Sequence, residues 1–531
     1  MKRRTFLASG AALVAAPAIL RAQTKASVLR FVPEADVVIF DPVTSPSWQT
    51  RDYAYLIYDT LFGMDDENRP QPQMLEGYNV SNDGLTWTLT LRDGLKFHDN
   101  EPVRARDVVP SVRRWGARDA FGQALMAATN DISATNATND KTVTIRLKKP
   151  FPLLPNALAK TMAYPCMVMP ERIASTDPFK AITETIGSGP YRFVANERVP
   201  GAKLVFERFQ GYVPRKGGTP SQTAGPKVAN FDRVEWTIMQ DTATAAAALQ
   251  RGEIDWLQTP NNDLIPTLRS NKNIVVRTIL PTGLIAYMRF NHLTPPFNNP
   301  AIRRALIGAV NQSDYMIAIN GADKSLWRDG IGYFAPTSPY ASKAGMEHLT
   351  SKRDYAKVKS ELQKAGYKGE KVVMLVAVNI PYLKMMGEVT ADMFKKIGMN
   401  YDYVATDWTT VVQRRNKTEP AEQGGWNLFS IYDNGANELD PASHLLLRGN
   451  GKEAQFGWPT MPKIEELRSA WFDAKDLGQQ KKICEQIQLQ AFEDVPYIPL
   501  GQSIPPTAYR KDLTGVLNGH PFFWNVRRQA G

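Results

Sequence analysis

The sequence predicts an α/β protein with helices packed on largely parallel sheets, and three observations support this prediction. Short segments with alternating apolar and polar residues, typical of strands, recur between segments with the apolar spacing of helices. Residues that favour helix starts and ends stand at the borders of the helical segments. The chain of 531 residues shows no repeat or low-complexity tract, and its length suits roughly two to four domains.

Residues 1–22 have the composition of an export signal and precede the predicted fold. A basic start is followed by an apolar stretch too short to span a bilayer, and then by small residues. Arg3 and Arg4 before Thr-Phe-Leu resemble a twin-arginine signal, and an ordinary secretory leader with a chance arginine pair is the alternative. We expect cleavage near Ala22, no lipid anchor because no cysteine follows, and a mature protein in the periplasm.

The charge and the cysteines exclude some classes of function. Without the leader's four basic residues the formal net charge falls from +11 to +7. Because no Lys/Arg block interleaves with aromatic residues, we expect no nucleic-acid partner. No other apolar stretch is long enough for a membrane span. Cys166 and Cys484 permit a disulfide in an exported protein, and two buried thiols are at least as consistent with the sequence.

A β-meander is predicted within 81–103. Apolar residues alternate with threonines over 85–91, which gives one buried and one solvated strand face. Asp-Gly pairs at 83–84 and 93–94 favour tight turns, because glycine readily adopts positive φ and aspartate bonds its own backbone. The meander is a sheet wall and carries no chemistry of its own.

The following segments justify the α/β prediction in order. Residues 231–257 are typical of strand, helix and strand, with Asp241 or Thr242 as the helix cap and Gly252 as its end. The later predicted elements are a helix capped by Asn298 or Asn299 with Pro300 in its first turn, a helix ending at Gly366, a strand at 371–378, a helix at 382–397, a strand at 399–407, a strand at 426–433 and helices at 461–475 and 478–493.

Four stretches, in the same order, resemble the family 5 extracellular solute-binding proteins, which are the dipeptide-, oligopeptide- and nickel-binding components of ABC importers. They are the extended meander at 58–115, "GSGPYRF" at 187–193, "DRVEWTIMQDTATAAAALQRGEID" at 232–255 and "PFNNPAIRRALIGAVNQSD" at 296–314. The resemblance covers nearly the whole mature chain. It implies a type II periplasmic binding protein: two α/β lobes joined by a hinge, with an extra domain inserted in the first lobe.

The resemblance also implies domain boundaries. We expect lobe I at 28–52, 185–284 and 495–531, the inserted extra domain at 53–184, and lobe II at 285–494. The chain departs from the family at Arg104, where a threonine usually forms a capping box with Asp107. Because arginine cannot cap and Pro110 follows soon after, we expect this helix to start late or to be kinked.

The resemblance implies ligand-binding residues as well. Asp433, at the end of "NLFSIYD", matches a carboxylate that holds the ligand's α-amino group in peptide-binding members; capping of the following turn is the alternative. Asp36 matches an acidic position that faces the cleft, or is a solvated strand end. Trp408 matches a tryptophan that lines side-chain pockets, or is a core residue.

Further candidates are arginines and aromatic residues. Arg414 or Arg415 is a candidate to hold a carboxylate by two parallel hydrogen bonds, although most helical arginine pairs are solvated. Phe121, Tyr287 and Asn291 are candidates from the alignment alone. The Gly-rich run 440–460 shapes the cleft edge or forms a surface loop.

The predicted function is the substrate-binding component of an ABC importer. A di- or oligopeptide would be captured between the lobes and delivered to a membrane permease with cytoplasmic ATPases, by a monomer without cofactor or metal. The same role for a metal chelate, oligosaccharide or opine is one alternative. A secreted hydrolase is the alternative of another class, but no HExxH, GxSxG or glycine-rich phosphate loop occurs. The five histidines include no pair with the spacing of metal ligands on one helix.

Overall fold

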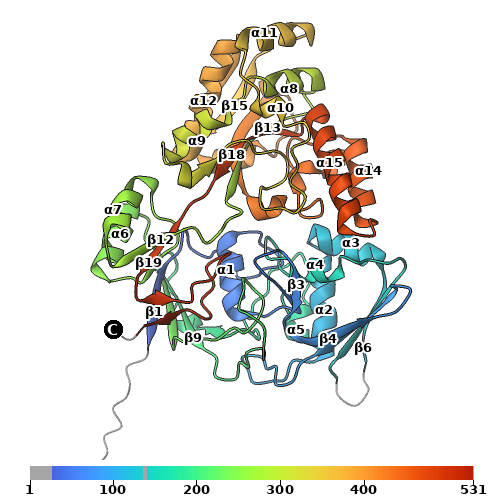
Figure 1. The fold of residues 1–531 in the computed structure, drawn as a ribbon, viewed down its shortest axis with the longest axis vertical. Coiled ribbons are helices and arrows are strands. Elements are labelled where there is room, and N and C mark those ends of the chain that lie inside the picture. The colour runs from blue at the N-terminus through green and yellow to red at the C-terminus, as the bar shows by residue number, and fades with distance from the viewer. Residues whose placement is uncertain (1–26, 136–139, 530–531) are drawn as a thin grey trace, which may run out of the picture.

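The computed structural model describes residues 27–135 and 140–529, so the predicted export signal lies outside the described residues. Two large sheets form the centres of two lobes, which are stacked along the long axis of the molecule (Figure 1). A smaller antiparallel sheet beside lobe I belongs to the extra domain. In the described part of the chain, no helix is both long and apolar enough to cross a membrane.

The sheet of lobe I has seven strands in the order β12-β19-β11-β1-β10-β9-β8. Its strands are β1 (Val28–Val32), β8 (Tyr191–Phe193), β9 (Lys203–Arg208), β10 (Arg233–Thr237), β11 (Trp256–Leu257), β12 (Ile274–Arg277) and β19 (Thr507–Arg510). Helix α6 (Thr242–Arg251) joins β10 to β11; Asp241 accepts a hydrogen bond from the N–H of Thr244 (2.7 Å), and Gly252 ends the helix with φ 76°. The predicted strand, helix and strand at 231–257 are confirmed.

The extra domain contains the predicted meander. Strands β4 (Leu75–Val80), β5 (Thr86–Leu91), β6 (Thr129–Thr135) and β7 (Thr142–Leu147) pair in the order β4-β5-β7-β6. Along β5 the apolar residues are buried and the threonines are half-buried, as the alternation predicts. Helices α2 (Ala105–Gly116) and α3 (Ala120–Ala128) pack on this sheet.

The start of α2 differs from the prediction. The helix begins at Ala105, directly after Arg104, so the expected late start was wrong. The backbone N–H of Arg104 donates to Asp107 Oδ2 (2.8 Å), which supplies half of a capping box without a capping side chain at Arg104. Pro110 lies inside the continuous helix.

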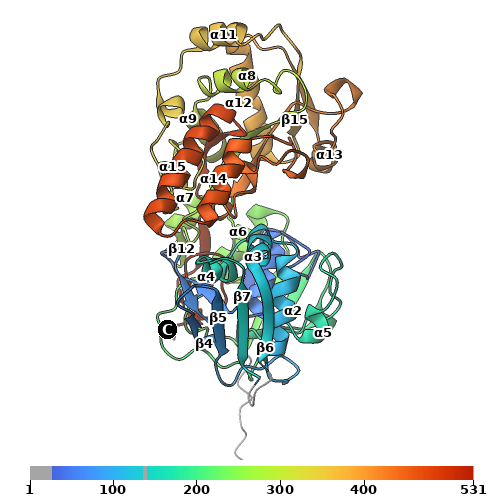
Figure 2. The ribbon, with the colours of Figure 1, turned by 90° about the vertical axis from the view of Figure 1, so that its right-hand side faces the viewer.

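The sheet of lobe II has six strands in the order β14-β18-β13-β17-β15-β16. They are β13 (Leu284–Phe290), β14 (Trp327–Arg328), β15 (Val372–Ala377), β16 (Tyr401–Thr406), β17 (Leu428–Asn434) and β18 (Tyr497–Ser503). The helices of this lobe are α8 (Pro300–Ile307), α9 (Gln312–Asn320), α10 (Glu347–Thr350), α11 (Tyr355–Lys364), α12 (Pro381–Ile397), α13 (Trp408–Arg414), α14 (Pro462–Phe472) and α15 (Leu477–Asp494), and Figure 2 shows them around the sheet. The predicted helices and strands after residue 298 are thus confirmed.

The expectation of largely parallel sheets was wrong. Within the two large sheets of the described chain, four of eleven strand pairings are parallel. The parallel pairs include β1–β10 and β15–β16. Strand β19 enters the lobe I sheet directly from β18 of lobe II, and β13 enters the lobe II sheet directly from β12 of lobe I. No local helical crossover therefore imposes a parallel direction on these two strands.

The remaining described α-helices and strands complete these three units. They are α1 (Trp48–Ile57), β2 (Phe62–Met64), β3 (Pro70–Pro72), α4 (Leu154–Ala159), α5 (Glu171–Ala174), α7 (Ile265–Ser270), β20 (Leu513–Thr514) and β21 (Arg527–Arg528). Cys166 and Cys484 are buried free thiols, so they form two unpaired thiols and not a disulfide. Burial raises the pKa of both thiols.

The chain crosses between the two large sheets twice. One crossing joins β12 to β13 over residues 278–283, and the other joins β18 to β19 over 504–506. The segment expected to belong to lobe I from 495 therefore begins with a strand of lobe II, because β18 pairs with β13. The expected boundary at 53 falls inside α1, whose buried residues pack into the core of lobe I.

Candidate functional site

The candidate ligand site lies on one face of the lobe II sheet. Strand β13 pairs antiparallel with β17 and β18, and the register places Tyr287 opposite Ile431 and Asp433 opposite Ile285. Residues paired in this way point to the same side of a sheet, and alternate residues of a strand share a face. Asp433 and Tyr287 therefore face the same side, together with Tyr497 of β18, which pairs with Arg289.

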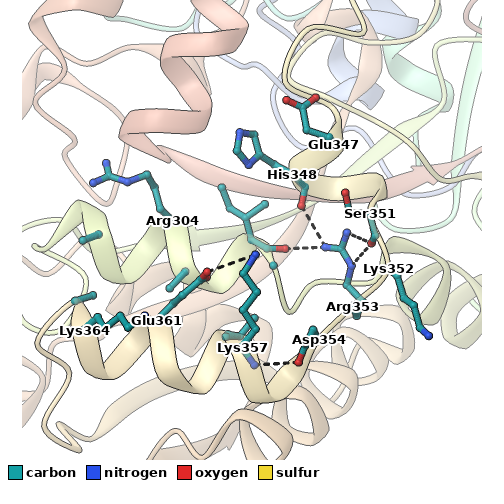
Figure 3. A pocket seen from close by; sticks show the side chains of 16 residues that line it. Arg304, Glu347, His348, Ser351, Lys352, Arg353, Asp354, Lys357, Glu361 and Lys364 are labelled. Carbon is teal, nitrogen blue, oxygen red and sulfur yellow. Dashed lines mark hydrogen bonds and ion pairs between the residues drawn. The ribbon is translucent and has the colours of Figure 1, made fainter.

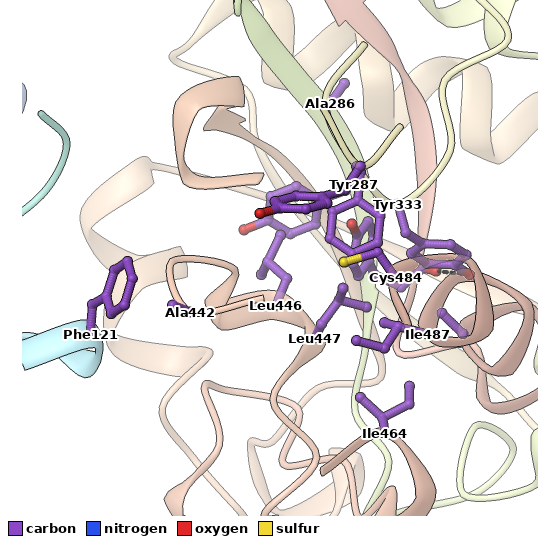
Figure 4. Packing of buried hydrophobic residues seen from close by; sticks show 14 of the residues in the cluster. Phe121, Ala286, Tyr287, Tyr333, Ala442, Leu446, Leu447, Ile464, Cys484 and Ile487 are labelled. Atoms are coloured by element: carbon purple, nitrogen blue, oxygen red, sulfur yellow. Dashed lines mark hydrogen bonds between the residues drawn. The ribbon is translucent and has the colours of Figure 1, made fainter. Parts of the chain in front are cut away.

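The loop after β17 covers this face of the sheet. The guanidinium of Arg289, which is fully buried, donates to the carbonyl oxygens of Phe456 (2.9 Å), Leu446 (3.1 Å) and Pro496 (3.1 Å). Burial lowers the pKa of Arg289 to about 10. Figure 4 shows Leu446 and Leu447 of the loop beside Tyr287. Residues 440–460 thus form a cover over the sheet, held in part by the buried cation of Arg289.

Asp433 lies at the end of β17. Its Oδ1 accepts hydrogen bonds from the backbone N–H of Asn434 (2.7 Å) and from Asn437 Nδ2 (2.8 Å). In the part of the chain that the structure describes, Oδ2 accepts no hydrogen bond and no cation pairs with the carboxylate. Burial raises the pKa of Asp433, against the lowering by these two hydrogen bonds. The carboxylate therefore holds its own turn with one oxygen and leaves the other for a donor.

The two neighbouring arginines of α13 differ in their surroundings. Arg414 Nε donates to the carbonyl oxygens of Gly424 (3.1 Å) and Gly425 (3.0 Å), which commits it to the fold. The guanidinium carbon of Arg415 lies 4.3 Å from the ring centre of Phe456 and 5.2 Å from that of Trp408. These contacts are cation–π interactions.

Arg415 has no anionic partner within the described residues. Its Nε is buried without a hydrogen-bond partner, and no carboxylate lies within 4.0 Å of its guanidinium. Burial lowers the pKa of Arg415. The phenolate form of Tyr287 would raise this pKa, which means that the two side chains are close enough to interact electrostatically. Arg415, Trp408, Tyr287 and Asp433 form one group, which we call the charged group.

The structure places the other three candidates outside the charged group. Both carboxylate oxygens of Asp36 accept backbone N–H donors, from Val37 (2.8 Å) and Gly201 (2.8 Å). Asn291 is fully buried; its Nδ2 donates to the carbonyl of Trp426 (3.0 Å) and its Oδ1 accepts from the N–H of Leu293 (3.0 Å). The polar atoms of both side chains therefore serve the fold.

Phe121 lies between the extra domain and lobe II. Its ring centre is 6.0 Å from Phe472 and 6.4 Å from Trp471, both on α14. It also lines a cavity of about 250 Å³, together with Lys160 of the extra domain and Asp440 of lobe II. Phe121 is thus an interface residue, and Figure 4 shows it well apart from Tyr287 of the charged group.

Sequence reasoning missed the residues that lobe I contributes between the lobes. Glu34, Arg51 and Gln258 of lobe I line a cavity of about 70 Å³ with Asn434 of lobe II. Glu34 and Gln258 follow the carboxyl ends of the neighbouring parallel strands β1 and β11. In open α/β sheets ligands bind at such strand ends, so this position was the available signal.

A surface pocket of about 650 Å³, formed by α8, α10 and α11, is a different feature (Figure 3). All its lining residues belong to lobe II, so it does not lie between the lobes. Arg353, at its wall, donates to the carbonyl oxygens of Ile307 (3.1 Å), Val310 (3.1 Å) and His348 (3.2 Å). This cation caps helix ends and is not available to a ligand.

Known proteins are similar to this chain over nearly its whole length. The chain is 36% identical to the "Probable peptide ABC transporter periplasmic-binding protein y4tO" of Sinorhizobium fredii (98% of each chain). It is 27% identical to the "Glutathione-binding protein GsiB" of Pectobacterium atrosepticum (97% of this chain, 96% of that protein).

Solved structures share the fold. The dipeptide binding protein of Pseudoalteromonas sp. SM9913 in complex with Met-Leu matches with a TM-score of 0.75 at 21% identity, over 94% of this chain and 100% of that one. AgaA of A. tumefaciens R10 in complex with agropinic acid matches with a TM-score of 0.76 at 20% identity, over 95% and 99%. The family model "Bacterial extracellular solute-binding proteins, family 5 Middle" matches residues 69–453. The chain therefore belongs to the family 5 extracellular solute-binding proteins.

Proposed function

We propose that this chain is the periplasmic ligand-capturing component of an ABC importer and that it takes a di- or oligopeptide between its lobes. Membership of the family and the similarity to a protein named as a peptide transporter component support this function. The partners would be a membrane permease and its cytoplasmic ATPases. We propose that the protein acts as a monomer, after export and cleavage near Ala22, and releases its ligand chemically unchanged.

The observation that carries the peptide proposal is the pair of opposite charges in the charged group. Asp433 has a carboxylate oxygen without a donor, and Arg415 has a buried Nε without an acceptor among the described residues. A peptide is a zwitterion, and its charges must find partners when they leave water. The α-amino group would bind Asp433, and the carboxylate would bind Arg415.

Tyr287 and Trp408 would complete the site. The ionisation of Tyr287 responds to both charges: burial raises its pKa most, Asp433 adds to this, and Arg415 opposes it. Tyr287 is therefore positioned to contact a ligand that spans the two charges. Trp408 is half-buried against Arg415 and offers an aromatic surface to a side chain.

A zwitterionic solute other than a peptide is the second candidate, because the same charge pair suits it. The AgaA structure with agropinic acid shows that this fold also holds a non-peptide ligand. Within the described chain, no group of three or more metal-binding side chains is found, and we propose no metal site.

Native mass spectrometry of the mature protein from its own periplasm, with fragmentation of the released ligand, tests the proposal. We expect a mixture of short peptides. A single non-peptide solute would overturn the peptide proposal and leave the transport role standing. Turnover of peptides or glycosides by the pure protein would overturn the transport role in favour of a hydrolase.

A further inference from the structure

A buried acid close to the charged group has no role in the function proposed above. Glu438 ends the short 3₁₀ turn Gly435–Glu438 after β17, and its exposed fraction is 0%. Among the residues that the structure describes, neither carboxyl oxygen has a hydrogen-bond partner, and no basic side chain lies within 4.0 Å. Buried polar groups are nearly always hydrogen-bonded, so this carboxyl needs an explanation.

Glu438 shares its surroundings with Asp433. Its backbone carbonyl accepts a hydrogen bond from the N–H of Ala335 (3.0 Å), which ties the turn to the loop between β14 and α10. Burial raises the pKa of Glu438 well above its usual value, and the charge of Asp433 raises it further. With Asp433 Oδ2, three carboxyl oxygens in this region have no donor within the described chain.

The other ionisable groups around Glu438 supply no countercharge. Tyr287 and Tyr497 are within electrostatic range of its carboxyl, and burial raises the pKa of both phenols. Arg289 donates through Nε and Nη1 to three backbone carbonyls; its buried Nη2 has no partner among the described residues, and no carboxylate lies within 4.0 Å of its guanidinium. His444 Nε2 shares hydrogen bonds with Tyr333 O (2.7 Å) and the hydroxyl of Tyr497 (3.1 Å), and burial lowers the pKa of His444 to about 3, so this ring is neutral at neutral pH.

We propose that Glu438 is a second acidic residue of the ligand site and selects ligands with two cationic groups at one end. This inference rests on the proposed function. The α-amino group of a peptide would bind Asp433, and a basic side chain of its first residue would bind Glu438. A lysine or arginine side chain carries the donors that the orphaned oxygens lack.

The acid–base chemistry of the Glu438 carboxyl supports its proposed role in binding a second cationic group. Burial raises the pKa of Glu438 well above its usual value, which favours the neutral carboxylic acid and avoids an unpaired buried charge. A cationic group that binds there stabilises the carboxylate, so the O–H bond of Glu438 breaks and the proton passes to the buffer. A ligand without that second cation gives the carboxylate no such stabilisation and should release fewer protons.

A matched pair of peptides tests the inference. One begins with lysine and the other with norleucine, which has a side chain of similar length without the ammonium group; alanines follow to a total of two to four residues. Isothermal titration calorimetry would measure both affinities in the mature protein at pH 6, in two buffers of different ionisation enthalpy. We expect the lysine peptide to bind at least tenfold more tightly and to release more protons than the norleucine peptide.

Three variants complete the test. Glu438→Gln should reduce the lysine preference to about onefold, while norleucine binding stays within twofold. Glu453→Gln removes one charge from an exposed position of the same loop and should preserve the preference. Asp433→Asn should weaken both peptides together.

The outcomes separate the two proposals. Equal binding and equal proton release by the two peptides in the wild type would overturn the role of Glu438 and leave peptide binding intact. So would a lysine preference that persists in Glu438→Gln. Proton release needs no variant, so it remains informative even if Glu438→Gln fails to fold. Binding of neither peptide at any length would overturn the proposed function itself.

Discussion

The replacement of Asp433 by asparagine is the sharpest test of the amine anchor. Asparagine has nearly the same shape, and its carbonyl oxygen can still accept from the N–H of Asn434 and from Asn437 Nδ2. The substitution removes the negative charge at the oxygen that no described donor occupies. We therefore expect the fold to survive and a cationic ligand group to bind more weakly.

The expected magnitude is that of one hydrogen bond between the ligand's ammonium group and a carboxylate. A hydrogen bond to a charged group contributes about 1.5–3 kcal/mol, and each 1.4 kcal/mol is about a tenfold change, so affinity should fall roughly 10- to 150-fold. Isothermal titration calorimetry with a bound peptide and its N-acetylated form gives the measurement. Acetylation removes the ammonium group, so the variant should not weaken the acetylated peptide further.

Thermal unfolding of the ligand-free variant is the control for the fold. If Asp433→Asn binds the unmodified peptide within twofold of the wild type, the amine anchor lies elsewhere. If the variant weakens the acetylated peptide as much as the unmodified one, Asp433 acts through the shape of its turn and not through its charge.

The remaining predictions concern the carboxylate end, the pH response and the lobe interface. Arg415→Gln should weaken the binding of peptides with a free carboxylate by roughly tenfold or more and leave the binding of C-terminal amides unaffected. Arg414→Gln should lower thermal stability without discriminating between the two kinds of peptide. Equal effects of the two variants on binding would contradict the assignment of Arg415. Because the folded pKa of Glu438 lies above its usual 4.5, the stabilisation from its neutral form is complete below about pH 4.5 and is lost as pH rises through the folded pKa. The melting temperature of the ligand-free wild type relative to Glu438→Gln should therefore fall from pH 4 to pH 8, and a constant difference would disprove the raised pKa. Phe121→Ala removes about 3 kcal/mol of packing, part of it between the extra domain and lobe II, and should enlarge the radius of gyration of the ligand-free protein in X-ray scattering. The control Leu125→Ala, in the extra-domain core, should leave the radius of gyration unchanged. An unchanged scattering curve for Phe121→Ala would show that this contact does not hold the lobes together.

Local features of the fold were predictable because short stretches of sequence encode them. The alternation at 85–91 and the cap and stop of α6 depend on residues a few positions apart. The direction of β18 and the lobe it joins depend on pairing with β13, more than 200 positions earlier in the chain. No local pattern records such a pairing, so both the parallel-sheet expectation and the boundary at 495 failed.

The candidate site also has features that the sequence shows and features that only the fold shows. A charged residue at a strand end, such as Asp433, is visible in the sequence. Which of two adjacent arginines faces the site depends on the last turn of α13 and on the glycines at 424 and 425, which bind Arg414. The isolation of Glu438 could not be predicted, because the lack of a partner is a property of everything around it.

The two crossings between the lobes have a mechanical consequence. A Cβ on Gly283 would lie 2.3 Å from the carbonyl oxygen of Ser503, and Gln502 Nε2 donates to the carbonyl of Thr282 (2.7 Å). The first connector thus lies against the end of β18, next to the second connector, and the two crossings form one narrow strap instead of two independent tethers. Such a strap permits rotation about a single axis and resists torsion, so one pair of spin labels across the lobes would follow the entire opening coordinate.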